Sequence, residues 1–142
     1  MVHKIEITID VIVHATEDMS KILQSFEDVL EIKEEDFTIE ETEGHFDNPI
    51  ILLNAKIIKK QSQNFMKKLH ELLPAEQIDD LIDEIEERTV DSRFHLRLDK
   101  QELIKGNLLV REKDTIKLKI HTPIYNKKDT VKTFTEILKI AN

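Results

Sequence analysis

The chain has 142 residues and a formal net charge of −8, a size that suits one ordinary domain. It contains two glycines and no cysteine, which excludes glycine-rich phosphate loops, disulfides, thiolate zinc sites and a cysteine nucleophile. Apolar residues make up 39% and charged residues 35% of the chain. We therefore expect a single domain over residues 1–142, with a compact core and a heavily charged surface.

Charge is distributed unevenly along the chain. Residues 1–49 carry a net charge of −11 and residues 75–91 carry −7, whereas residues 50–74 carry +4 and residues 92–142 carry +6. The overall acidity would repel a polyanion at long range, but a local basic face can bind one within a Debye length of about 8–10 Å. The alternative is that acidic helices and basic strands alternate only for solubility.

The first half of the chain predicts three strands and one helix. Residues 3–13 alternate charged and apolar side chains, as in a strand with one buried face. Apolar residues at 19–30 then recur every three or four positions, which predicts a helix capped by Thr16. Residues 37–43 and the apolar run 50–58 are expected to be the next two strands, joined by a turn.

The second half predicts two helices, two strands and a terminal helix. Ser62 is expected to cap the first helix, and Pro74 should separate it from the next. A short helix or turn ending at Gly106 should follow the fourth strand. The helical stripes and strands are expected at residues 65–73, 78–85, 93–98, 115–121 and 131–140.

The element order βαββααββα predicts an α+β fold, with a mixed or antiparallel sheet and helices packed on one face. Such a sheet has edge strands, so we expect a weak homodimer. No apolar run approaches the roughly 20 residues that span a bilayer, and the first residues do not resemble a signal peptide. We therefore expect a cytoplasmic protein without membrane partners.

Motifs for catalysis or metal binding are scarce. The six histidines form no HExxH or HxH pattern, and no GxSxG sequence occurs. The acidic side of the helix at residues 78–85 lacks the glycine turn and oxygen spacing of a calcium loop. We expect no catalytic residue, no metal ligand and no cofactor. A small-molecule or metal-dependent enzyme, with a site assembled from distant residues, is kept as an alternative.

Three segments resemble a known family in their order and separation. They are residues 14–18 (HATED), residues 42–45 (TEGH) followed by 48–50 (NPI), and residues 96–101 (LRLDKQ). Together they resemble the archaeal RNA-binding family described as predicted exosome subunits, over most of the chain. The resemblance implies a fold similar to that of the 5S-RNA-binding ribosomal protein of the large subunit. It also implies RNA and RNA-processing proteins as partners.

Basic side chains on two predicted strands are the candidate RNA contacts. Arg97, Lys117 and Lys119 share one surface if strands 93–98 and 115–121 pair, and two histidines, His95 and His121, would enlarge it. Such donors suit phosphate and 2′-hydroxyl contacts, whereas aromatic residues for base stacking are missing. The predicted RNA-binding residues are Lys56, Lys59, Arg97, Lys100, Lys117, Lys119 and, in the turn after the second strand, His45.

The leading hypothesis is therefore a non-catalytic RNA-binding protein that contacts the RNA backbone. The alternative from another class is a protein-interaction or assembly module that uses its acidic helices and has no affinity for RNA. Gel-shift experiments with RNA at low salt distinguish these two hypotheses.

Overall fold

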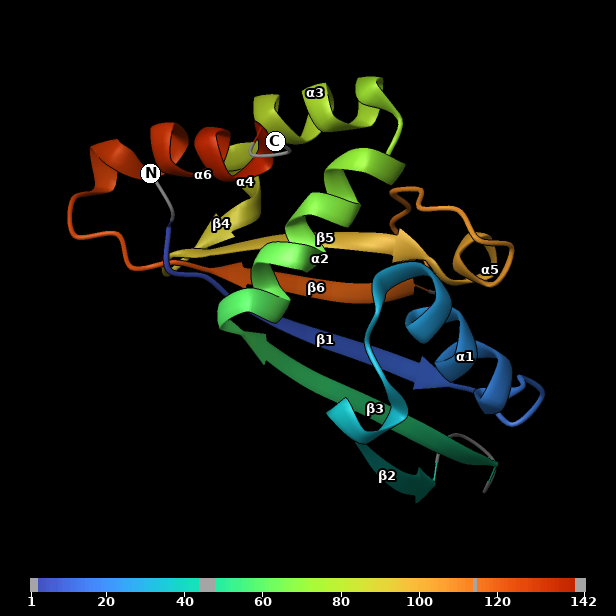
Figure 1. Ribbon diagram of the computed structural model, residues 1–142. Coiled ribbons are helices and arrows are strands. Elements are labelled where there is room, and N and C mark those ends of the chain that lie inside the picture. Colours follow the sequence, from blue (N-terminus) through green and yellow to red (C-terminus); the bar gives the residue numbers. More distant parts are fainter. Residues whose placement is uncertain (1–2, 44–47, 114, 140–142) are drawn as a thin grey trace.

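The computed structural model describes residues 3–43, 48–113 and 115–139. These residues form one antiparallel sheet of six strands, in the order β2-β3-β1-β6-β5-β4, with helices packed beside it (Figure 1). In chain order the elements are β1 (Glu6–Val13), α1 (Met19–Leu30), the 3-10 helix η1 (Glu34–Asp36), β2 (Phe37–Glu43), β3 (Pro49–Ile58), α2 (Lys59–Leu72), α3 (Ala75–Asp83), α4 (Ile85–Arg88), β4 (Thr89–Val90), β5 (Arg93–Asp99), α5 (Lys100–Ile104), β6 (Thr115–His121), the 3-10 helix η3 (Lys127–Asp129) and α6 (Thr130–Lys139).

The helices cover one face of the sheet. α1, α2 and α6 lie on the same side of the strands, and α3 and α4 pack next to α6 (Figure 1). Their apolar stripes place Phe26, Phe65 and Phe134 in one core cluster with the inward side chains of β1. Burial of each such side chain contributes roughly 1.5–3 kcal/mol. The predicted α+β fold, an antiparallel sheet with helices on one face, is confirmed.

The other face of the sheet carries no helix among the described residues, and we call it the open face. In β1, the half-buried residues Glu6, Thr8 and Asp10 alternate with the fully buried Ile7 and Ile9. Successive strand side chains point to opposite faces, so the polar residues of this alternation project from the open face. Their exposure leaves this side of the sheet accessible for binding.

A short helix and a short strand that the sequence pattern did not predict lie between α3 and β5. After α4, the strand β4 pairs with the start of β5 through a turn at Asp91 and Ser92. Both residues have positive φ, 50° and 64°, as a type I′ hairpin turn requires. The glycine that usually signals this turn is absent, which explains why the hairpin was not predicted.

Two predicted helix caps are wrong. Asp18, not Thr16, caps α1, because its carboxylate accepts a backbone N–H of the first turn. Ser62 lies inside α2, which begins three residues earlier. The Ser62 side chain is fully buried, and its hydroxyl donates to the carbonyl of Ile5 at 3.1 Å. Ser62 therefore ties α2 to the start of β1 instead of starting the helix.

The two edges of the sheet differ. The edge of β5 is covered by β4 and by the following loop, in which the N–H of Arg111 donates to the carbonyl of Arg97 at 3.0 Å. β2, by contrast, pairs only with β3 among the described residues. Unpaired backbone groups of an edge strand can pair with a second chain.

The weak homodimer predicted from the sequence would use the β2 edge. Its glutamates Glu40, Glu41 and Glu43 would face one another in such a pair, which keeps the association weak. Light scattering after gel filtration should give a mass that rises toward twice 16.7 kDa with protein concentration. A constant mass of 16.7 kDa at every concentration would show that the protein is a monomer.

Candidate functional site

The pairing of β5 with β6 gathers basic side chains on the open face. In this register Arg97 lies opposite Lys117, and His95 lies opposite Lys119. Directly opposite residues of an antiparallel pair have Cβ atoms about 4.5–5.5 Å apart. The predicted pairing of these strands, and the shared surface of Arg97, Lys117 and Lys119, are confirmed. We call the following six residues the basic strip: Arg93, His95, Arg97, Lys117, Lys119 and His121.

The central cations of the basic strip lack anionic partners. Within the described ranges, no carboxylate forms an ion pair with Arg97, Lys117 or Lys119. Asp10 neighbours Lys117 in the register, but its carboxylate accepts a hydrogen bond from the amide of Asn54 at 2.6 Å. Like charges directly opposite each other destabilise a sheet. A bound anion would relieve this repulsion.

The pKa of His95 reflects the positive charge of the basic strip. Its imidazole is half-buried, and this burial is the largest cause that lowers the pKa of His95 below 6.5. The positive charges of Lys119, Arg93 and Arg97 lower the pKa further. His95 is therefore mainly neutral at pH 7, and the site disfavours additional positive charge until an anion is present.

The basic strip borders a broad depression of the open face. The depression has a volume of about 620 Å³ and extends from β5 across to β2. Beyond β6, the depression is lined by Asp10 and Ile12 of the adjacent strand β1, by Leu52 of β3 and by Glu40 of β2. Because acidic groups occupy that side, a polyanion would lie along β5 and β6 instead of crossing the sheet.

A second, smaller hollow flanks the other side of the basic strip. It has a volume of about 310 Å³, and its outer wall includes Arg88 and Glu112. The guanidinium of Arg88 is already bound, to Glu84 at 2.8 Å and to Glu112 at 3.0 Å. Arg88 therefore fixes α4 next to β5 and adds little free positive charge to the site.

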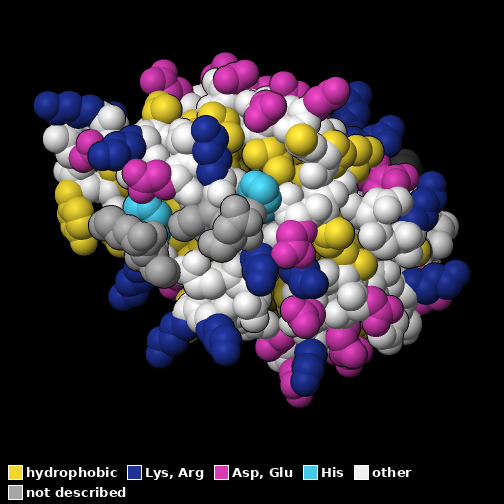
Figure 2. All heavy atoms as spheres, turned by 45° about the horizontal axis from the view of Figure 1, so that its top comes forward, with side chains coloured by type: hydrophobic (Ala, Val, Ile, Leu, Met, Phe, Trp, Pro, Cys, Tyr) yellow, Lys and Arg dark blue, Asp and Glu magenta, His cyan; other side chains and the backbone are white. Residues whose placement is uncertain are grey.

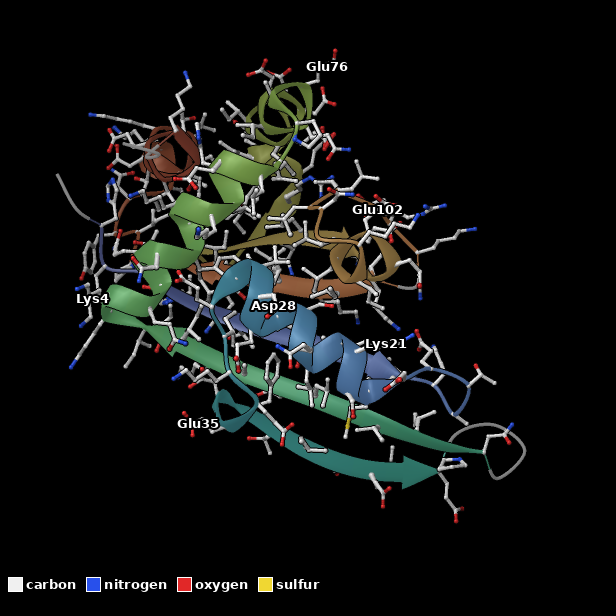
Figure 3. All side chains as sticks on the ribbon, turned by 45° about the vertical axis from the view of Figure 1, so that its right-hand side comes forward. Lys4, Lys21, Asp28, Glu35, Glu76 and Glu102 are labelled. Carbon is white, nitrogen blue, oxygen red and sulfur yellow. The ribbon has the colours of Figure 1, made fainter. Side chains whose placement is uncertain are left out.

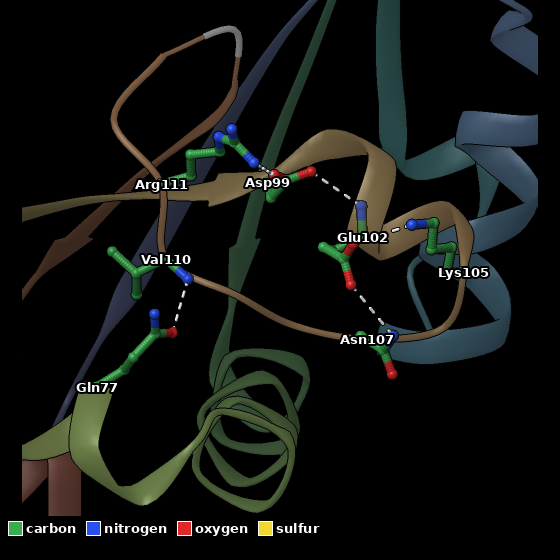
Figure 4. A network of polar contacts seen from close by, with 7 residues as sticks. All are labelled: Gln77, Asp99, Glu102, Lys105, Asn107, Val110 and Arg111. Atoms are coloured by element: carbon green, nitrogen blue, oxygen red, sulfur yellow. Dashed lines mark hydrogen bonds and ion pairs between the residues drawn. The ribbon is translucent and has the colours of Figure 1, made fainter.

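A network of polar contacts holds the loop after α5 against β5 (Figure 4). The carboxylate of Asp99 accepts hydrogen bonds from the N–H of Glu102 at 2.9 Å and from Arg111 at 2.8 Å, and the N–H of Val110 donates to Gln77 at 2.8 Å. Burial alone would raise the pKa of Asp99, but these donors outweigh it and lower the pKa. The loop thereby covers the edge of the strand that carries Arg97.

Lys56 and Lys59, both predicted as RNA contacts, lie apart from the basic strip. Lys56 belongs to the open face of β3, and β1 separates it from β6. Its ammonium forms an ion pair with Glu6 at 3.1 Å. Lys59 is the first residue of α2, at the end of the sheet where β3 finishes.

Lys100 is not available to a ligand, and its assignment to the RNA-binding surface requires correction. Its side chain is 2% exposed, and the ammonium donates to the carbonyl of Ile12 at 2.7 Å and to Glu17 at 3.0 Å. Lys100 was predicted as a contact because it follows the exit of the strand, but it continues the even-numbered series of the buried Leu96 and Leu98, and Asp99 caps α5 at this point. His45, the remaining predicted contact, lies outside the described residues.

In the described part of the chain, no group of three or more His, Cys, Asp or Glu residues is placed to hold a metal ion. The same residues include no helix that is long and apolar enough to cross a bilayer.

Comparison with known proteins shows the family of the chain. Residues 6–122 match a family model whose description is RNA binding. The chain belongs to this RNA-binding family. A Pyrococcus abyssi protein named as an RNA-binding protein is 34% identical, covering 94% of this chain and 92% of the relative. An uncharacterised Methanocaldococcus jannaschii protein is also 34% identical, covering 89% of this chain and 91% of the relative.

Solved archaeal structures share the fold. A protein from Methanothermobacter thermautotrophicus has a TM-score of 0.75 at 28% identity, covering 96% of this chain and 99% of that one. A protein from Archaeoglobus fulgidus has a TM-score of 0.80 at 24% identity, covering 94% of this chain and 99% of that one. The sheet and its helices are therefore common to these archaeal proteins of similar length.

Proposed function

We propose that this protein of the RNA-binding family binds RNA without catalysis, through the basic strip of its open face. The observation that carries the proposal is the register of β5 and β6, which collects unpaired cations in a chain whose net charge is −8. Arginine binds phosphate through two parallel hydrogen bonds, and lysine contributes a point charge. Phosphate contacts of this kind bind RNA with little dependence on its sequence.

The site is suited to the RNA backbone more than to stacked bases. The basic strip contains no Phe, Tyr or Trp, and Phe94, the phenylalanine of β5, is fully buried. Recognition of single-stranded bases usually relies on exposed aromatic rings, whereas structured RNA is contacted through phosphates and 2′-hydroxyls. We therefore infer that the protein prefers structured RNA and reads its shape.

We further propose that the protein takes part in RNA processing and that it associates with exosome machinery. The family resemblance supports this role. The acidic face of α3 supports it as well, because Glu76, Asp79, Asp80 and Asp83 are exposed and repel RNA. Figure 2 shows acidic side chains gathered along the upper edge of its view, and Figure 3 labels Glu76 in the first turn of α3. This face is the candidate surface for protein partners.

Electrophoretic mobility shifts test RNA binding directly. Structured and single-stranded RNAs of mixed sequence should both be shifted at low salt, and the structured RNA should remain bound at higher salt. If no RNA is shifted even at low salt, the protein is an interaction module that uses its acidic helices.

RNA affinity is expected to rise as the pH falls. Phosphates near His95 stabilise its protonated form, so binding raises a pKa that is lowered in the free protein. Binding therefore takes up a proton, and affinity increases as pH falls through the range below 6.5. We expect the dissociation constant to fall about three- to tenfold between pH 7.5 and pH 5.5, since one unit of pKa shift corresponds to tenfold.

The two histidines of the basic strip provide the control for this pH dependence. His121 lies 3.7 Å from the carboxylate of Glu6, which competes with an RNA phosphate for this imidazole. His95→Gln should therefore flatten the pH profile, whereas His121→Gln should retain most of it. An unchanged profile in His95→Gln would exclude His95 from the RNA site.

A further inference from the structure

A second basic region lies at one end of the sheet, where β1 begins and where β3 and β6 finish. It is a hollow with a volume of about 770 Å³. Figure 3 places Lys4 at this end, beside the start of α2. We call this region the end hollow, and its principal side chains are Lys4, Ile58, Lys59, Lys60, His121 and Pro123.

The end hollow is positively charged. In the described ranges, Lys4, Lys59 and Lys60 form no ion pair with a carboxylate. The acidic residue that lines it, Glu6, already pairs with Lys56 at 3.1 Å and approaches His121 at 3.7 Å. Three lysine ammoniums therefore border a hollow whose carboxylate is engaged elsewhere.

The end hollow is continuous with the basic strip. His121 belongs to both, because it is the last residue of β6 and also lines the hollow. It lies four positions along the strand from Lys117, a span of about 13 Å. A polyanion that lies along β6 would therefore reach the lysines of the hollow.

Lys59 occupies a strained backbone position at the corner of the hollow. Its φ is 55°, in the left-handed region that glycine and asparagine adopt more readily. No connecting residue lies between the end of β3 at Ile58 and α2. The chain thus holds a cationic side chain at a position where a glycine would be less strained.

We propose that the end hollow is a second phosphate site, which takes the backbone of the same RNA strand as it leaves the basic strip. This inference rests on the proposed function and extends the RNA path around the end of the sheet. Lys59 and Lys60 bind the phosphate, while Ile58, 45% exposed, and Pro123 offer an apolar floor for the sugar. The site therefore takes one or two nucleotide units of a longer strand.

A pair of matched double variants on α2 tests this site. Lys59→Gln with Lys60→Gln removes two charges from the hollow, whereas Lys67→Gln with Lys68→Gln removes two charges from the same helix outside it. With structured RNA, the hollow variant should lower the slope of log affinity against log salt by about 1.4–1.8, the value for two lost phosphate contacts. The control variant should leave that slope unchanged.

The outcomes separate this inference from the proposed function. If the hollow variant behaves like its control while Lys117→Gln with Lys119→Gln loses affinity, the second site is wrong and the proposed function stands. If only the hollow variant loses affinity, the hollow binds phosphate and the basic strip is not the principal surface. If neither variant changes binding, both proposals fail.

Two further measurements exclude a structural effect and a free-nucleotide site. Lys59→Gly places a glycine at the residue with positive φ, so the melting temperature of this variant should be unchanged or higher. The slope of its log RNA affinity against log salt should fall. A lower melting temperature with an unchanged slope would contradict the proposal. Calorimetry with adenosine monophosphate should detect no tight binding. A mononucleotide affinity equal to that for RNA would show a free-nucleotide site instead.

Discussion

Replacing Arg97 and Lys119 together with alanine should lower the slope of log affinity against log salt by about 1.4–1.8, because each lost phosphate contact contributes about 0.7–0.9. Both residues lie on the open face, and neither forms an ion pair among the described residues. Their removal should therefore leave the fold intact while RNA affinity falls for every sequence tested. Fluorescence anisotropy across a salt series measures the slope, and circular dichroism checks the fold.

A control variant with the same change in net charge separates the effect of where the two charges lie from the effect of the total charge of the protein. Lys105 and Lys132 are exposed residues of the α5 and α6 regions, away from the basic strip. Lys105→Ala with Lys132→Ala should retain the salt slope of the unmodified protein. Equal slopes in the two double variants would show that the basic strip is a solvated face without a role in RNA binding.

Lys100→Met should destabilise the protein by about 3 kcal/mol, because removing one partner of a buried ion pair leaves the other charge uncompensated. Glu17 would lose the ammonium now 3.0 Å away, and the carbonyl of Ile12 would lose its 2.7 Å hydrogen bond. Urea unfolding measures the loss. Lys105→Ala removes an exposed pair with Glu102, so it should cost about 0.5 kcal/mol or less.

The Lys100 variant also separates structural from RNA-binding lysines. At a temperature where Lys100→Met is folded, its RNA salt slope should equal that of the unmodified protein. Adding Glu17→Leu should recover part of the lost stability, since removing both charges is far less costly than removing one. A stable Lys100→Met protein with a reduced salt slope would place Lys100 on the binding surface after all.

Most strands could be predicted because their two faces meet different surroundings. In β6 the apolar residues Ile116, Leu118 and Ile120 are buried, while Lys117 and Lys119 point to the open face. The alternation in the sequence records this difference directly. The same reasoning in β5 placed Arg97 beside β6, so the centre of the basic strip could be predicted before the register was known.

The alternation of polar and apolar residues no longer predicts which side chains are exposed where a strand is followed directly by a helix. Lys100 was grouped with the polar residues that follow β5, but its backbone already belongs to α5, and its partner Glu17 is 83 positions away in the sequence. No local pattern records such a distant contact. The cap predicted at Ser62 was wrong for a related reason, because a hydroxyl that caps a helix and one that ties two elements together look alike in sequence.

The net charge of each segment predicted only some of the residues of the basic surface. Residues 50–74 carry a net charge of +4, and Lys56 and Lys59 among them were predicted as RNA contacts, but the fold separates the lysines of this segment. Lys56 pairs with Glu6 on the open face, Lys59 and Lys60 line the end hollow, and α2 carries the others. Net charge over a segment cannot show which side of a strand or helix each lysine occupies.

Chemical-shift mapping of the isotope-labelled protein during titration with a structured RNA tests the central claim most directly. The largest changes should fall on backbone amides of residues 93–97 and 117–121, which carry the basic strip, while residues 75–83 of the acidic α3 should not change. Changes concentrated on α3, with none along β5 and β6, would contradict RNA binding at the open face.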